Sequence, residues 1–318
     1  MQMITHIVEV RGPKVSGGRR SPEAVGAVLK WLDPLVREVV SMAFRYTSKT
    51  SGRPPQWLMA ASTVRFADVS NGDGGTRLHF EVPRLGEAAE ELYRQKELFK
   101  TKPNQTDTGF DLLGDLLRDI REQQRDSYRF DTQLLRQVGR FRSAEKRWGV
   151  ESLTLHGDRL PKKVPATIDK QVSELASSLA AQTPAPARAR ITGKLDMIRA
   201  SDGTFSMILD TREAVQGLWL PADTELLKEH WRELVVVEGN AVFRASGSLL
   251  RIEAQAMSPA AESDMFFSVM PEAAPLRLDT RQFRQPQTPK RGVGAIFGKW
   301  PGDESEEELL VALKGKHR

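Results

Sequence analysis

The chain contains no cysteine. Disulfide bonds, thiolate nucleophiles and cysteine-ligated zinc sites are therefore excluded, and a cytoplasmic location is expected. No segment approaches the run of about 18 apolar residues that a membrane-spanning helix needs. Residues 1–10 lack the charged and apolar regions of a signal peptide. Apolar residues make up only 39% of the chain, which predicts that a sizeable part of it is surface or linker.

Common catalytic and metal-binding motifs are also missing. The five histidines are scattered along the chain and are expected to be ordinary surface or interface residues: His6, His79, His156, His230 and His317. Neither an H-E-x-x-H nor a G-x-S-x-G motif occurs. Residues 12–17 have the glycine spacing of a phosphate-binding loop, but Gly18 stands where its lysine belongs. We therefore expect a flexible basic loop here and a non-catalytic protein without metal or cofactor.

The length of 318 residues predicts two domains and a tail. The formal net charge is +5, with 47 basic residues interspersed among 42 acidic ones. A mildly basic balance of this kind is compatible with nucleic-acid binding but does not require it. The predicted organisation is listed here in chain order: an α+β domain (1–182), a Pro/Ala linker (183–189), a small barrel (190–257), an extended basic linker (258–298) and a tail helix (299–318).

The α+β domain is predicted from alternating segments of period two and helical period. The expected strands are 5–10, 62–69, 76–82 and 151–156. The expected helices are 22–44, 85–99, 107–125, 130–141 and 166–181. Ser21 should cap the first of these helices, and Pro34 should kink or split it.

Four aspartates repeat every four residues in the expected helix 107–125: Asp107, Asp111, Asp115 and Asp119. Their carboxylates should share one face of the helix, opposite a leucine-rich face. A metal cluster can have this pattern, but it needs further ligands from other elements. We therefore expect a solvated face.

The segment 190–257 has the clearest pattern in the chain. Three strand-like runs precede a run of helical period that starts at Asp223, and two further strand-like runs follow from Leu234. This order resembles an OB-fold, a five-stranded barrel with a helix between its third and fourth strands. Gly193 and Gly239 fall in mid-strand, where such a barrel bends sharply.

An OB-fold implies a possible site for single-stranded nucleic acid, built from cations and stacking aromatic rings. The candidate cations are Lys194, Arg199, Arg244 and Arg251. The candidate aromatic rings are Phe205, Trp219 and Phe243. The alternative is that these rings fill the barrel. Burial is favoured for Phe205, which shares a strand face with Met207, and the two alternatives are even for Trp219.

The end of the chain combines a tryptophan with an amphipathic helix. Trp300 precedes an acidic segment that starts at Asp303, and Leu309, Leu310 and Leu313 then form an apolar stripe. The acidic residues favour the start of a helix. A helix this short must dock on something, either its own protein or a partner.

The run Gly-Lys-Trp-Pro-Gly-Asp-Glu at 298–304, with the acidic-to-leucine helix after it, resembles the C-terminal tails of bacterial antitoxin-type proteins encoded beside PIN-domain ribonucleases. The resemblance implies a protein partner, such as a nuclease, that the tail restrains in a toxin–antitoxin or defence system. Trp300, Asp303, Leu309, Leu310 and Leu313 would bind that partner. This is the first functional hypothesis, and single-stranded nucleic-acid binding by the barrel is the alternative.

Overall fold

The computed structural model describes residues 2–15, 21–49, 52–72, 74–93, 103–160, 166–199, 202–221 and 225–274. The chain divides into two compact units, Met1–Ala274 and Pro275–Arg318. The second unit, with the predicted tail helix, lies outside the described residues. Among the described helices, none is long and apolar enough to cross a bilayer.

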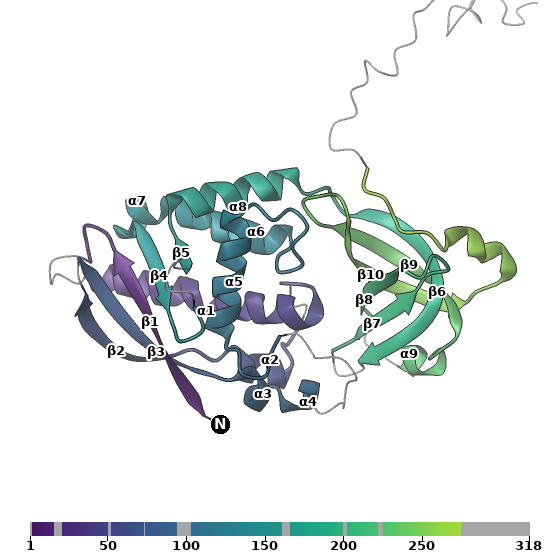
Figure 1. Ribbon diagram of the computed structural model, residues 1–318, viewed down its shortest axis with the longest axis horizontal. Helices are drawn as coiled ribbons and strands as arrows, with labels where there is room; N and C mark the ends of the chain where they lie inside the picture. Colours follow the sequence, from purple (N-terminus) through teal and green to yellow (C-terminus); the bar gives the residue numbers. More distant parts are fainter. Residues whose placement is uncertain are drawn as a thin grey trace, which may run out of the picture. The chain divides into compact units, whose positions relative to one another are not determined.

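The α+β part is built on one five-stranded sheet (Figure 1). Its strands are β1 (Met3–Arg11), β2 (Arg65–Gly72), β3 (Gly75–Pro83), β4 (Ser152–His156) and β5 (Ala166–Ile168). Their order in the sheet is β2-β3-β1-β4-β5, and every neighbouring pair is antiparallel. With two helices between β1 and β2 and several more between β3 and β4, the first four strands have the order of a split β-α-β-β-α-β motif.

The helices of this part are α1 (Pro22–Arg45), α2 (Gln56–Ala61), α3 (Leu85–Ala88), α4 (Glu90–Tyr93), α5 (Gly109–Arg121), α6 (Thr132–Gly139), the 3₁₀ helix η1 (Arg140–Ser143), α7 (Ala144–Trp148) and α8 (Lys170–Gln182). Ser21 caps α1 as predicted, because its hydroxyl accepts a hydrogen bond from Ala24 N at 3.4 Å. Pro34 lies inside α1 without splitting it. Leu32 before Pro34 and Leu35 after it are both buried, so packing of one continuous face supports the helix through the proline.

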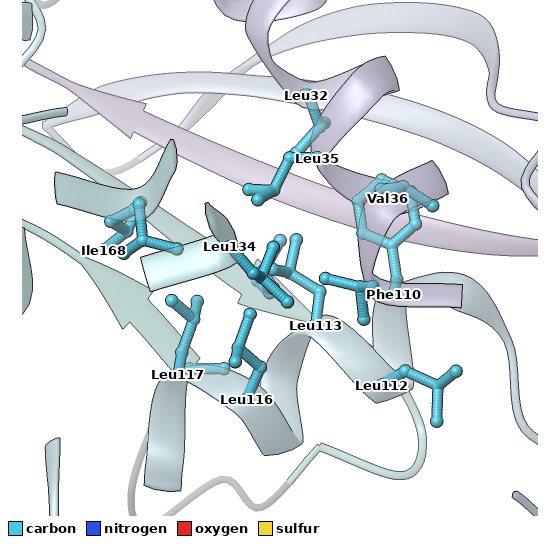
Figure 2. Packing of buried hydrophobic residues seen from close by; sticks show 14 of the residues in the cluster. Leu32, Leu35, Val36, Phe110, Leu112, Leu113, Leu116, Leu117, Leu134 and Ile168 are labelled. Carbon is cyan, nitrogen blue, oxygen red and sulfur yellow. The ribbon is translucent and has the colours of Figure 1, made fainter. Parts of the chain in front are cut away.

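One face of the sheet is covered by helices, and the core lies between them. Figure 2 shows leucines of α5 between α1, α6 and the edge strand β5. Strand residues that point to this side, such as Val8, Leu78 and Phe80, are at most 1% exposed. The opposite face carries polar side chains, as the alternation in β3 predicts.

Two predicted helices differ from the structure. The segment predicted as a helix at 85–99 forms the short helices α3 and α4 as far as Tyr93, beyond which it is not described. The segment 166–181 starts with β5, which pairs with β4, before α8 begins. Asp169 separates the two because its carboxylate accepts a hydrogen bond from Val172 N at 2.8 Å and so caps α8.

The second part is a closed five-stranded barrel, as predicted. Its elements are β6 (Ala187–Arg199), β7 (Thr204–Ile208), β8 (Ala214–Trp219), α9 (Glu225–Glu229), β9 (Leu234–Phe243) and β10 (Leu249–Pro259), followed by the 3₁₀ helix η2 (Glu262–Phe267). The strand order is β10-β8-β7-β6-β9, and the parallel pair β8–β10 completes the closure. This arrangement, with α9 between the third and fourth strands, is compatible with an OB-like barrel.

Two mid-strand glycines allow strands of the barrel to approach closely. A Cβ atom at Gly193 would lie 2.8 Å from Ile208 O. A Cβ atom at Gly239 would collide with Glu253 O, beside the register shift between Ala254 and Ala256. Both positions were predicted as bends, and the close backbone contacts give the physical reason for glycine there.

The substitution Gly239→Ala should therefore destabilise the barrel. The methyl group would meet backbone atoms that cannot rotate away, and we expect the free energy of unfolding to fall by about 1–3 kcal/mol. Gly26→Ala in α1 is the control, since nothing lies within 4 Å of its Cβ position. That change should raise the free energy of unfolding by up to about 1 kcal/mol. Urea unfolding followed by tryptophan fluorescence measures both, and equal stability of Gly239→Ala and wild type would contradict the packing account.

Candidate nucleic-acid interface

The barrel and the α+β part are joined by a contact that we call the seam. Its apolar part consists of Val242, Ala245 and Leu250, barrel residues that belong to the buried core of the α+β part. Its polar part is formed by the segment 244–251 of the barrel with residues Tyr46, Arg125, Asp126 and Asp131. The seam therefore positions the ends of β9 and β10 against the helices.

Arg251 is the buried charge at the centre of the seam, with its side chain 5% exposed. Its guanidinium donates to Tyr46 O at 2.7 Å and to Glu253 Oε1 at 2.5 Å. It also lies 3.7 Å from Asp131 Oδ2. Asp131 caps α6 by accepting from Leu134 N, and it accepts from both N and Oγ of Ser48. One guanidinium thus links the end of α1, the start of α6 and a barrel strand.

The loop between β9 and β10 is held by Asp126. Its Oδ1 atom accepts hydrogen bonds from Ser246 Oγ at 2.5 Å and from Ser248 Oγ at 2.7 Å. These two bonds lower the pKa of Asp126. Ser246 N donates to Arg125 O, and the Arg125 side chain donates to Ala245 O at 3.1 Å. The loop is therefore fixed at both its backbone and its side chains.

Half-buried tyrosines lie within electrostatic range of barrel arginines. Burial raises the pKa of Tyr46, while Arg199 and Arg244 oppose the rise. Burial and the charge of Asp107 raise the pKa of Tyr93, and Arg199 again opposes the rise. Tyr128 acts electrostatically on Tyr46, so these rings, which are the three tyrosines of the chain, gather in one region. Neutral phenol rings next to guanidinium groups can stack on bases while the cations contact phosphates.

A second cationic surface covers α6, η1 and α7. We call it the basic patch, and its residues are Arg136, Arg140, Arg142, Lys146 and Arg147, all exposed. Glu145 is the one acidic residue between Arg136 and Arg147. Within the described residues none of the five cations forms an ion pair. The segment 136–147 spans at most about 20 Å along a helix. Its cations therefore lie close together and produce a positive potential that attracts polyanions.

The predicted solvated face of four aspartates is wrong. Asp107, Asp111 and Asp119 are each at most 8% exposed. Asp107 pairs with Arg159. Asp111 forms a capping box with Thr108 at the start of α5. Arg129 donates to Asp119 at 2.8 Å and lies 3.7 Å from Asp115. Partners from distant segments neutralise the aspartates, and no group of three His, Asp or Glu side chains in the described residues is arranged to hold a metal ion.

The histidine prediction is wrong for His6. Its ring is buried, stacks on Phe110 with centroids 5.3 Å apart and bonds Thr108 Oγ1 at 3.0 Å. Burial lowers its pKa. Among the others, His79 lies 2.7 Å from Ser70 Oγ, and His230 lies 2.9 Å from Glu233. His317 is outside the described residues, as are the glycines of the loop at 16–20.

The structure separates the residues predicted for nucleic-acid binding. Lys194 is exposed on β6, Arg244 lies at the seam, and Arg199, with its side chain 15% exposed, pairs with Asp202 at 3.5 Å. Arg251 is engaged in buried ion pairs and is not a free surface cation. The predicted aromatic rings belong to the barrel core, with exposures of 0% for Phe205, 5% for Trp219 and 1% for Phe243. The tail residues Trp300, Asp303, Leu309, Leu310 and Leu313 lie outside the described residues.

The tyrosines and the basic patch are not among the residues predicted from the sequence. A signal for the tyrosines exists, because each has an arginine next to it in the chain: Arg45-Tyr46, Tyr93-Arg94 and Tyr128-Arg129. The basic patch is visible as five cations in the segment 136–147. No protein-family model, curated protein or solved structure matches the chain.

Glu38 gives a pH-dependent prediction near the inner end of the patch. Burial and the charge of Asp131 raise its pKa from 4.5 to about 7. The folded state then holds this proton more tightly than the unfolded state, so the free energy of unfolding falls as the pH rises from 4.5 to about 7. Glu38→Gln removes this loss. At pH 8 the free energy of unfolding of Glu38→Gln should therefore be higher than that of wild type by about 1–2 kcal/mol. This range allows for the partial exposure of Glu38.

Urea unfolding at about pH 5 and pH 8 tests this expectation, because the difference between variant and wild type should nearly vanish at the lower pH. Glu174→Gln, on the exposed side of α8, is the matched control. An equal difference at both pH values would show that Glu38 titrates normally.

Proposed function

We propose that the protein binds single-stranded nucleic acid and has no catalytic role. The observation that carries the proposal is that Arg199 and Arg244 both act electrostatically on Tyr46, and Arg199 also on Tyr93. In an OB barrel the loop after the first strand and the loop between the fourth and fifth strands contact the ligand. Here Arg199 ends β6 and Arg244 follows β9, and both act on Tyr46. If the barrel is of OB type, its ligand loops border the aromatic region.

The basic patch supports the same function through long-range electrostatics. Lys and Arg side chains that contact phosphates displace condensed counterions, which favours binding and makes it sensitive to salt. Trp148 adds a half-buried indole ring at the end of α7. The strand's phosphates would lie on the patch and on Arg199 and Arg244, and its bases would stack on the tyrosines.

A charge-reversal variant tests the proposal. Arg136→Glu, Arg140→Glu and Arg147→Glu together should weaken binding to a fluorescent oligonucleotide of about 15 nucleotides and flatten the salt dependence by about 0.7 per lost phosphate contact. Anisotropy titrations at about 50 and 200 mM salt measure both effects. The control reverses Arg65, Lys228 and Arg232, which are exposed elsewhere. Absence of binding at low salt would refute the function, and an unaffected triple variant would exclude the patch.

The tail supports a second candidate on sequence grounds. Trp300 and the stripe Leu309, Leu310 and Leu313 form an apolar anchor behind an acidic first turn. Burial of each leucine in a partner groove would contribute roughly 1.5–3 kcal/mol. We propose that this tail binds and restrains a protein encoded by the neighbouring gene, such as a nuclease.

Deletion of residues 299–318 tests the tail. Since a proline-rich segment precedes the tail, the deletion should leave the melting temperature unchanged and abolish co-purification with the neighbouring gene product. Retained co-purification, or a melting temperature several degrees lower, would indicate that the tail packs on its own protein.

A further inference from the structure

A cavity of about 240 Å³ lies next to the tyrosine region. Its walls come from α1, the segment before α5, α5 itself and the segment before α6. Val39, Ala43 and Leu112 form an apolar side, and Tyr128 contributes an aromatic ring. Asn104, Asp107, Asp115 and Arg129 supply the polar groups. An apolar cavity with a few convergent polar groups is the usual form of a small-ligand site.

The polar side of the cavity mainly accepts hydrogen bonds. Ionised carboxylates only accept, and each oxygen has more than one lone pair. Asp107 already accepts a hydrogen bond from Asn104 N at 2.9 Å and forms an ion pair with the Arg159 guanidinium. Asp115 forms an ion pair with Arg118 at 3.1 Å. The guanidinium of Arg129, the one cation in the lining, donates to Asp119 at 2.8 Å, and it also lies 3.7 Å from Asp115 and over one face of the Tyr128 ring, 5.1 Å from its centroid. The cavity can therefore accept further hydrogen bonds from a ligand that carries N–H donors.

The charge balance agrees with this direction. Burial raises the pKa of Asp107, and the negative charges of Asp111 and Asp115 add to the rise, although Asn104 N and Arg159 oppose it. The lining holds two carboxylates, Asp107 and Asp115, and one cation, and each carboxylate also pairs with an arginine outside the lining. Their free lone pairs could accept hydrogen bonds from a flat group with amino hydrogens that lies beside the Tyr128 ring.

We propose that this cavity takes a nucleobase with an exocyclic amino group and so favours cytosine over uracil. The proposal rests on the proposed binding of single strands. Cytosine presents an amino donor where uracil presents a carbonyl oxygen, and aspartate is a usual acceptor for that amino group. The two rings have nearly the same size, so the apolar wall accepts both and the carboxylates discriminate.

Wild-type protein is titrated with fluorescent oligo(rC) and oligo(rU) of about 15 nucleotides. We expect oligo(rC) to bind about tenfold more tightly. Oligo(N4,N4-dimethyl-rC), which has no amino hydrogens, should bind no better than oligo(rU). Asp115→Asn should reduce the preference to within about twofold, because an amide also donates hydrogen bonds. Asp210→Asn, an exposed carboxylate on the barrel, should keep the full preference.

The failures of the two proposals are distinguishable. Equal, salt-dependent binding of oligo(rC) and oligo(rU) overturns the base preference and leaves single-strand binding intact. An unchanged preference with the dimethylated bases, which needs no protein variant, also overturns it. Failure of every oligonucleotide to bind at low salt removes the proposed function itself.

Discussion

The position of the barrel depends on one buried guanidinium. Arg251 is linked to Tyr46 O, Glu253 and Asp131, and Asp131 in turn holds the start of α6. A charge withdrawn from water needs several partners at once, and removal of any one leaves another group buried without compensation. The contact therefore tolerates few alternative geometries, because sliding the barrel would break bonds to two helices. Such ion pairs fix an arrangement more than they add to stability.

This constraint also sets the chemistry of the candidate interface. Arg244 and Arg251 flank the loop between β9 and β10, so fixing that loop places the charge of Arg244 within electrostatic range of Tyr46. Burial keeps the tyrosine hydroxyls protonated well above neutral pH. The Tyr93 hydroxyl donates to Pro103 O at 3.0 Å, whereas a neutral hydroxyl at Tyr46 could donate to a phosphate oxygen without repelling it. The hydrogen bonds that Ser246 and Ser248 donate to Asp126 further limit movement of the loop next to Arg244.

The barrel was predictable because its pattern is local. The change from period two to helical period at Asp223 and back at Leu234 needs no knowledge of tertiary contacts. The aspartates of α5 show the limit of such patterns. A spacing of four residues states that side chains share a helix face, but Arg129 and Arg159, which neutralise that face, come from other segments. Alternation favoured burial of Phe205, which is buried, and Trp219, for which the two alternatives were even, is buried as well. The tyrosines come from distant segments, so their proximity is not visible in local sequence. The helix prediction at 166–181 failed because Ile168 pairs with Leu153 of β4, a contact invisible in local sequence.

If the protein binds a single strand as proposed, the distribution of charge would give the strand a preferred orientation. The basic patch carries cations without acidic partners in the described residues, whereas the cavity beside Tyr128 carries carboxylates close to an aromatic ring. A sugar-phosphate backbone would gain electrostatic energy on the patch, and bases, which are neutral and planar, could lie at the cavity. Backbone contacts position a strand and base contacts discriminate sequence. A duplex cannot place a base edge in the cavity without unpairing it, at a cost of a few kcal/mol. Under the proposed function, these two surfaces would therefore favour a strand with exposed bases over a paired one.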